Sequence, residues 1–224
     1  MVVLQRAIHS GEKHERHHAI LDGAERLLLR SPGRVASMAE VAREAGLAKG
    51  TVYLYFPGKE ELLLALHERN IDGFFRALIA LLDERSAVAI EDVFELTRTH
   101  IVAPPLFLPL ASRCVGVMDQ NVPVSAANAF KQRMAQWLEL AGAGLERHFA
   151  VLEAGDGAVL LRHHYALILG LSQMTGDTSK GTDAPSEQSA SPALSGHHSD
   201  GLERAMFALW EGTLAGAARR GAKR

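Results

Sequence analysis

Cationic and hydroxyl-bearing side chains recur at close spacing between residues 49 and 59: Lys49, Thr51, Tyr53, Tyr55 and Lys59. Ammonium and hydroxyl groups donate hydrogen bonds to phosphate oxygens, and those that reach a groove of a duplex also contact base edges. Lys49 and Thr51 would lie in the first turn of a short helix. Lys59 would begin the next helix, where free N–H groups favour an anion. The segment is therefore a candidate contact with double-stranded DNA.

Two short helices are expected to position these side chains, over residues 37–44 and 49–56. Ser37 and Glu40 have the spacing of a capping box, in which the hydroxyl accepts one backbone N–H at the helix start and the carboxylate accepts another. Gly46 suits the left-handed backbone of a sharp turn. Two short helices joined by a glycine-containing turn form a helix-turn-helix, whose second helix enters the major groove.

The second short helix is expected to have two different sides. Val52 and Phe56, four residues apart, would face a small core. Gly50 has no side chain, so its backbone could approach a duplex closely. The alternative is that the Lys, Thr and Tyr side chains are merely solvated, because short amphipathic helices with a glycine turn occur in many helical proteins.

The ordered residues resemble the TetR (tetracycline-repressor-like) family of bacterial transcriptional regulators, most strongly over roughly residues 14–65. The resemblance rests on Met38-Ala39-Glu40-Val41-Ala42, Ala45-Gly46, Lys49-Gly50-Thr51-Val52-Tyr53-Leu54-Tyr55-Phe56 and Lys59-Glu60-Glu61-Leu62-Leu63.

The resemblance implies roles for the matching residues. Tyr53, Tyr55 and Lys59 would contact phosphates, and Ser37 would lie near the DNA backbone. The residues facing the major groove would be Lys49, Gly50, Thr51 and Leu54. Ala48 departs from the pattern, since relatives often carry a polar residue there. The resemblance also implies a homodimer on a palindromic operator, with a carboxy-terminal domain that dimerises and usually binds a small-molecule effector.

Composition narrows the class of protein. The chain has 224 residues, a hydrophobic fraction of 47%, a net charge of −2 and a single cysteine, Cys114. A lone cysteine excludes a disulfide scaffold, and no apolar segment has the length of a signal peptide or a membrane span. We therefore expect a cytoplasmic protein. Residues 1–60 contain nine Lys and Arg against seven Asp and Glu, so this section is the more cationic part of a slightly acidic chain.

Apolar residues recur at three- and four-residue steps along most of the chain, which predicts an all-α fold. We expect a DNA-binding domain over residues 1–60 and an effector-binding and dimerisation domain over 61–224. Residues 175–201 contain 15 Ser, Thr, Gly or Pro and predict a disordered loop. The expected helices cover residues 14–30, 37–44, 49–56, 59–84, 90–102, 105–117, 123–149, 157–174 and 201–219.

Two sets of residues in the carboxy-terminal part are candidates for further contacts. For each residue the alternative is ordinary core within the chain. Effector pockets are mostly apolar with a few polar groups. The bulky and polar side chains that could line such a pocket are Phe94, His100, Phe107, Arg113, Met118, Phe130, Met134, Trp137, His163 and Tyr165. The apolar stripes of the last two helices predict a dimer interface that includes Leu167, Leu171, Leu202, Met206, Leu209, Trp210 and Thr213.

Two other functions are alternatives to a DNA-binding regulator. Eleven histidines raise the possibility of a metal- or histidine-dependent sensor, and His14 and His18 lie one helical turn apart. Solvated or core histidine is the better interpretation, and no metal or other cofactor is expected. A helical binding module with a vestigial helix-turn-helix is the remaining alternative. No nucleophile or nucleotide motif of an enzyme is present in the sequence.

Overall fold

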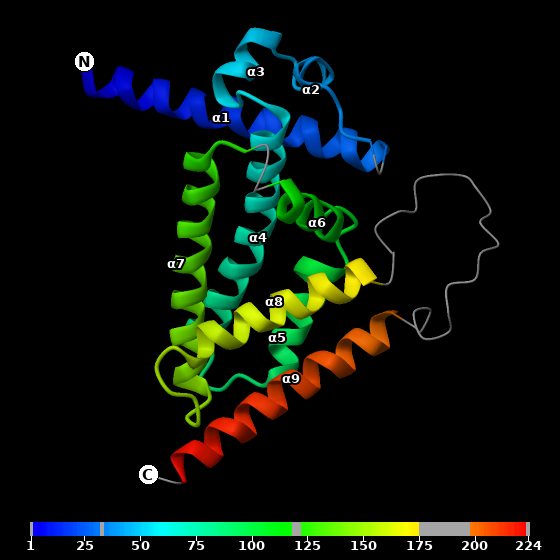
Figure 1. The fold of residues 1–224 in the computed structure, drawn as a ribbon. Coiled ribbons are helices and arrows are strands. Elements are labelled where there is room, and N and C mark those ends of the chain that lie inside the picture. Colours follow the sequence, from blue (N-terminus) through cyan, green and yellow to red (C-terminus); the bar gives the residue numbers. More distant parts are fainter. Residues whose placement is uncertain (1, 32–33, 118–121, 175–197, 223–224) are drawn as a thin grey trace, which may run out of the picture.

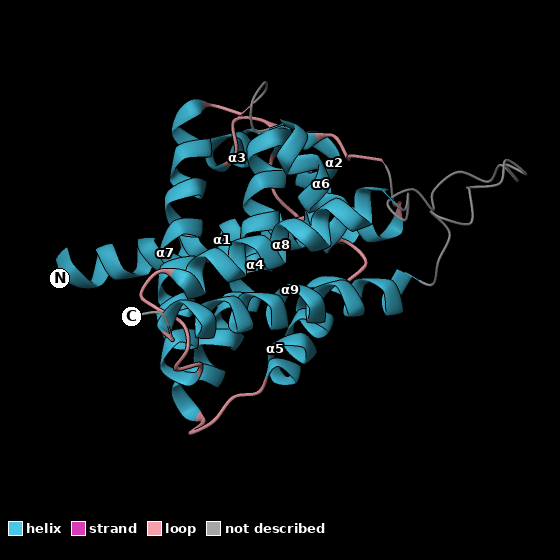
Figure 2. Ribbon diagram, turned by 60° about the horizontal axis from the view of Figure 1, so that its bottom comes forward, coloured by secondary structure: helices cyan, strands magenta, loops and turns pink. Residues whose placement is uncertain are grey.

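The computed structural model describes residues 2–31, 34–117, 122–174 and 198–222. Helices and connecting loops account for these residues, with no strand among them, so the predicted all-α class is confirmed (Figure 2). The elements are α1 (Val2–Arg30), α2 (Met38–Glu44), α3 (Lys49–Tyr55), α4 (Lys59–Glu84), α5 (Ile90–Thr97), the π-helical turn η1 (Arg98–Val102), α6 (Phe107–Val117), α7 (Val124–His148), α8 (Asp156–Met174) and α9 (His198–Gly221).

The helix boundaries differ from those expected by one or two residues in several places and more clearly in three. Helix α1 begins twelve residues before residue 14, and α9 begins at His198, so residues 198–201 are helical and the predicted loop was too long at that end. The rest of the predicted loop, residues 175–197, lies outside the described residues. The expected helix over 90–102 ends in a π-helical turn, in which the Ala103 N–H donates to the Arg98 carbonyl at 2.8 Å. Prolines 104 and 105 follow and have no N–H with which to continue an α-helix.

The amino-terminal helices form a head at one end of the molecule, where α1 crosses beneath α2 and α3 (Figure 1). Its core contains Ile20 and Leu21 of α1, Val41 of α2 and Val52 of α3, each at most 2% exposed. Helices α1 and α2 approach closely because Gly23 has no side chain. A Cβ atom there would lie 3.3 Å from the backbone nitrogen of Ala45.

Helices α4 and α6 belong to both the head and the body. Leu62 and Leu66 near the start of α4 lie in the head core together with Leu106 and Leu110 of the α6 region. Phe107, one residue after Leu106, lies instead in the body core with the later turns of α4. The head therefore joins the body through continuous packing.

The body is built from α4 to α9, with α9 beside α8 at the end away from the head (Figure 1). Helices α7 and α8 cross at glycines: a Cβ atom on Gly142 would lie 2.4 Å from the backbone nitrogen of Ala158. Trp210 is fully buried and fixes α9 to the rest of the body. None of the described helices is long and apolar enough to span a bilayer.

Candidate nucleic-acid interface

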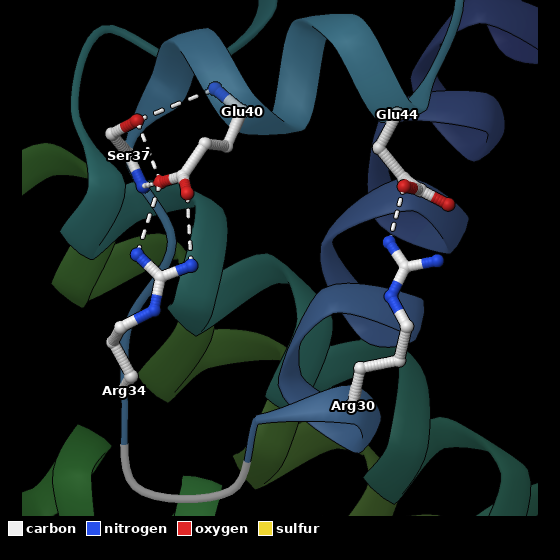
Figure 3. A network of polar contacts seen from close by, with 5 residues as sticks. All are labelled: Arg30, Arg34, Ser37, Glu40 and Glu44. Carbon is white, nitrogen blue, oxygen red and sulfur yellow. Dashed lines mark hydrogen bonds and ion pairs between the residues drawn. The ribbon is translucent and has the colours of Figure 1, made fainter.

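The start of α2 is fixed by the predicted capping box. The Ser37 hydroxyl accepts the Glu40 backbone N–H at 3.3 Å, and the Glu40 carboxylate accepts the Ser37 backbone N–H at 2.8 Å. Arg34 holds the same carboxylate through hydrogen bonds of 2.8 and 3.2 Å (Figure 3). Hydrogen bonding from Arg34, then from Ser37, lowers the pKa of Glu40 to about 2. Glu40 is therefore ionised at neutral pH and keeps the start of α2 in place.

The end of α2 is attached to α1 by a second carboxylate. Glu44 accepts a hydrogen bond from Arg30 (Figure 3) and another from Arg26 at 2.9 Å, and these contacts lower its pKa. The chain then turns at Gly46, whose φ of +68° is the left-handed conformation expected from the sequence. The Leu47 N–H donates back to the Ala42 carbonyl at 2.9 Å, which closes the turn. Together these contacts set the direction in which α3 leaves α2.

Helix α3 separates core residues from surface residues as the sequence predicted. Val52 is fully buried and Phe56 is 4% exposed. In contrast Tyr53 is 42% exposed and Leu54 is 85% exposed. An exposed leucine is unremarkable by itself, but here it shares a short helix with polar surface residues. Also exposed are Lys49 and Gly50, while Thr51 and Tyr55 are half-buried.

The two lysines of this surface keep their charge available. The Lys49 Nζ atom lies 5.7 Å from the centre of the Tyr53 ring, a cation–π distance that does not neutralise the ammonium. Lys59 is exposed at the start of α4, 3.7 Å from the Glu60 carboxylate, a solvent-exposed pair of the weak kind. The residue before it, Gly58, gives α4 no side-chain cap. The first turn of α4 therefore combines a cation with uncapped N–H groups.

Two features bear on the predicted contacts of α2. The Ser37 hydroxyl is already engaged, because it also donates to the Glu40 carboxylate at 2.9 Å. Sequence reasoning did not single out Arg43, which is exposed in the last turn of α2 with no ion pair among the described residues. Arg43 lies three residues before Gly46, at the turn between the two short helices, and this position in the sequence could have identified it.

The candidate effector residues fall into separate groups. Phe107, Phe130 and Tyr165 surround His67, which the sequence analysis missed; the ring centres of Phe107 and Phe130 lie 5.4 and 6.0 Å from that of His67. The Tyr165 hydroxyl lies 3.1 Å from His67 Nε2. His67 was identifiable, since it lies four residues before the buried Ile71 on the apolar side of α4.

The other candidate effector residues lie elsewhere in the body. Trp137 stacks on Phe75 with ring centres 5.6 Å apart, and Met134 packs against both the Phe130 cluster and the main body core. Phe94 stacks on His164 at 5.8 Å. The remaining candidates are Arg113 and His163, both exposed, His100, half-buried in η1, and Met118, which lies outside the described residues.

A second buried histidine joins three helices. Trp210 Nε1–H donates to His164 Nδ1 at 3.0 Å, so the His164 proton lies on Nε2. That N–H donates to the Thr97 hydroxyl at 3.0 Å, and the hydroxyl donates to the Val93 carbonyl at 2.8 Å. Burial lowers the pKa of both His164 and His67 to about 4. Both imidazoles are therefore neutral at physiological pH.

The candidate dimer residues divide by burial. Leu202, Met206 and Trp210 are at most 5% exposed and lie in the core of the chain itself, the alternative considered for each of them. Helical periodicity marks an apolar face but not the partner that covers it. Leu167, Leu171, Leu209 and Thr213 are half-buried.

No group of three or more His, Cys, Asp or Glu side chains within the described residues could hold a metal ion. The ring of His17, which lies between His14 and His18 in the sequence, packs with its centre 5.1 Å from that of the Phe56 ring in the head.

Cys114 is buried, and burial raises its pKa to about 12. A groove of about 290 Å³ lies where the end of α3 meets α4 and α7, and Tyr55 and Arg133 are among its lining residues.

Comparisons with known proteins agree with this geometry. The HTH-type transcriptional regulator EthR of Mycobacterium tuberculosis is 27% identical over 132 residues, 59% of this chain and 61% of that protein. The fatty acid metabolism regulator protein of Bacillus subtilis is 28% identical over 67 residues, 30% of this chain and 34% of that protein. The chain thus spans less than two thirds of the length of these curated relatives.

A solved structure shares the fold. A TetR-family transcriptional regulator from Mesorhizobium loti matches with a TM-score of 0.59 at 19% identity, covering 89% of this chain and 95% of that one. Family models cover most of the sequence: residues 20–66 match the bacterial regulatory proteins of the tetR family, and residues 68–217 match the tetracyclin repressor-like C-terminal domain. The chain therefore belongs to the TetR family of DNA-binding transcriptional regulators.

Proposed function

We propose that this regulator is a homodimeric repressor that binds a palindromic operator through α3 and is released by an apolar or amphipathic small molecule. The proposed mode of DNA binding rests on the two different sides of α3: Val52 is fully buried, whereas Leu54 is 85% exposed. The exposed residues are those that the family resemblance assigns to DNA. TetR proteins are regulators rather than enzymes, so the body serves regulation.

The proposed contacts follow from the position of each side chain. Lys49, Thr51 and Leu54 face the major groove, where leucine suits a thymine methyl group. Tyr53 and Lys59 bind phosphates on the flanking strands, and Arg43 extends the phosphate contacts at the end of α2. One head covers few base pairs. Two heads spaced about 34–36 Å apart would read two half-sites.

The outward face of α9 supports the proposed dimer. Leu202 and Trp210 attach α9 to the body, so the opposite side of α9 faces away from the core. That side carries Ala208 and Gly212, and no atom lies within 4 Å of a Cβ added at Gly212. Small residues let helices of two copies approach closely. Replacing Gly212 with Trp should give a folded monomer in sedimentation, while Trp in place of the exposed Ala135 of α7 should leave a dimer.

Packing between head and body supports ligand-induced release. Leu106 and Leu110 contact the head core, while Phe107 beside them contacts His67 in the body. A ligand that moves α4 or α6 would therefore shift the head, and the spacing of the two heads with it. The coupling cannot exceed the ligand's difference in affinity for the two conformations.

The experiment that tests the DNA-binding mode begins with selection of the operator from random DNA. Affinity for the selected site should fall steeply as salt rises, because phosphate contacts release counterions. Lys59→Ala should weaken binding to all sequences alike, whereas Thr51→Ala should change the preference among sequences. Arg98→Ala removes an exposed cation of the body as a matched control and should bind like wild type. Equal binding by all three variants would refute the proposed contacts.

A further inference from the structure

Two buried side-chain atoms stand out by their hydrogen bonding. His67 Nδ1 on α4 and Ser112 Oγ on α6 are the buried side-chain nitrogen and oxygen atoms within the described residues that have no hydrogen-bond partner. Folded proteins satisfy nearly all buried polar groups, and leaving one unpaired costs about 1–3 kcal/mol. Both atoms lie on the packed pair α4 and α6, which also contacts the head. They are therefore placed where bound molecules could act on the head.

The proton on the His67 ring can be assigned from its neighbour. Within the described residues the hydroxyl of the half-buried Tyr165 has one hydrogen-bond partner, His67 Nε2 at 3.1 Å. Burial, with a smaller effect from Cys114, raises the pKa of Tyr165, so its hydroxyl keeps its proton. If the hydroxyl donates to Nε2, one group stays unpaired, the Nδ1–H; the reverse direction would leave both the hydroxyl proton and Nδ1 unpaired, so the first arrangement is assigned. Nε2 is thus an acceptor, and a neutral His67 ring carries its proton on Nδ1. The unpaired atom is consequently a donor.

The surroundings of this donor are apolar and neutral. The rings of Phe107 and Phe130 flank His67, and its side chain is 2% exposed. The nearby Cys114 thiol keeps its proton because burial raises its pKa to about 12. An anion brought into such surroundings would lose its hydration without gaining a counter-charge. A neutral acceptor would instead complete the hydrogen bonding of His67 at little desolvation cost.

We propose that His67 Nδ1–H is the donor that recognises the effector, and that the effector is a neutral molecule carrying a carbonyl oxygen, as in an ester, amide or lactone, on an apolar body. Tyr165 is a positioning residue, since it fixes the proton on Nδ1. The assignment rests on the proposed release by a small molecule. His67 follows Lys59 by eight residues on α4, about 12 Å along the helix, so the donor and the DNA contact share one rigid element.

The test observes His67 directly in the full-length protein labelled with ¹⁵N-histidine. The probes are methyl hexanoate, N,N-dimethylhexanamide and γ-octalactone, with sodium hexanoate as the charged comparator. We expect at least one neutral probe to shift the His67 Nδ1 resonance and hexanoate to leave it unchanged. In titration calorimetry His67→Phe, which keeps an aromatic ring between Phe107 and Phe130, should bind that probe about tenfold more weakly. His18→Phe, at an exposed histidine on α1, is the matched control and should bind normally.

Tyr165→Phe gives a second, independent readout. Without the hydroxyl the proton on His67 is no longer confined to Nδ1, so the ¹⁵N shifts of the free protein should change and the probe should bind more weakly. The proposal is overturned if no neutral probe perturbs His67, or if His67→Phe binds the probe as well as wild type. Operator release is measured separately: binding at His67 without release would refute ligand control and leave the recognition site standing.

Discussion

Acid should destabilise this protein through its buried histidines, and the size of the effect follows from their pKa values. His67 and His164 have pKa values of about 4 when folded, against 6.5 when unfolded. Below pH 6.5 the unfolded chain therefore binds more protons than the folded chain, and the free energy of unfolding decreases as the pH is lowered from 6.5 to about 4. Between pH 7 and pH 5 each histidine should cost about 2 kcal/mol, so the two together should lower the free energy of unfolding by about 4 kcal/mol.

Urea unfolding at a fixed protein concentration measures this loss. The window above pH 5 is chosen because Glu40 and Glu44, whose pKa values are lowered, affect stability only at lower pH. His67→Phe should reduce the loss by about 2 kcal/mol, leaving the loss from His164 and a smaller one from the half-buried His17, whose pKa burial also lowers. His163→Phe removes an exposed histidine and should keep the full loss. An equal loss in wild type and His67→Phe would refute the assignment of a neutral, buried His67.

Three further predictions concern single sites. Gly46→Ala should lower the free energy of unfolding in urea by about 1–2 kcal/mol, because the φ angle of this residue is positive. Gly50→Ala should instead stabilise α3 by up to about 1 kcal/mol. A smaller effect at Gly46 than at Gly50 would contradict the turn geometry. Thr97→Val keeps the side-chain volume but removes the acceptor of the His164 N–H, and should cost about 1–3 kcal/mol in the same assay; an unchanged midpoint would count against the network. Cys114 should react with a thiol reagent only when the protein unfolds, and rapid labelling of the native protein would disprove its burial.

The sequence specified the head in detail because its signals are local. A capping box needs only Ser37 and Glu40, three residues apart, and a left-handed turn needs only Gly46. Helix α4 also has the bounds expected from its periodicity. By contrast, Gly23 matters only because Ala45 packs on it, a contact between residues distant in the sequence that no local pattern reveals.

The body was harder to predict because its important contacts are not local. Trp210 lies on an apolar stripe that suits a dimer interface and a core equally well, and the hydrogen bond to His164 shows which applies. His67 lies on the buried side of α4, yet the sequence cannot show that Tyr165, 98 residues later, meets its ring. The π-helical turn before Pro104 likewise depends on packing as well as on the prolines.

The central claim is that α3 contacts DNA through its exposed face, and Leu54→Glu tests it most directly. Leu54 is 85% exposed, so the substitution leaves the core intact but places a carboxylate against the duplex. Leu140→Glu on α7, at a side chain 63% exposed, is the matched control. In fluorescence anisotropy with the selected operator we expect wild type and Leu140→Glu to bind equally, and Leu54→Glu to bind about a hundredfold more weakly, a loss of about 3 kcal/mol. Equal binding by Leu54→Glu, with an unchanged unfolding curve, would contradict the account.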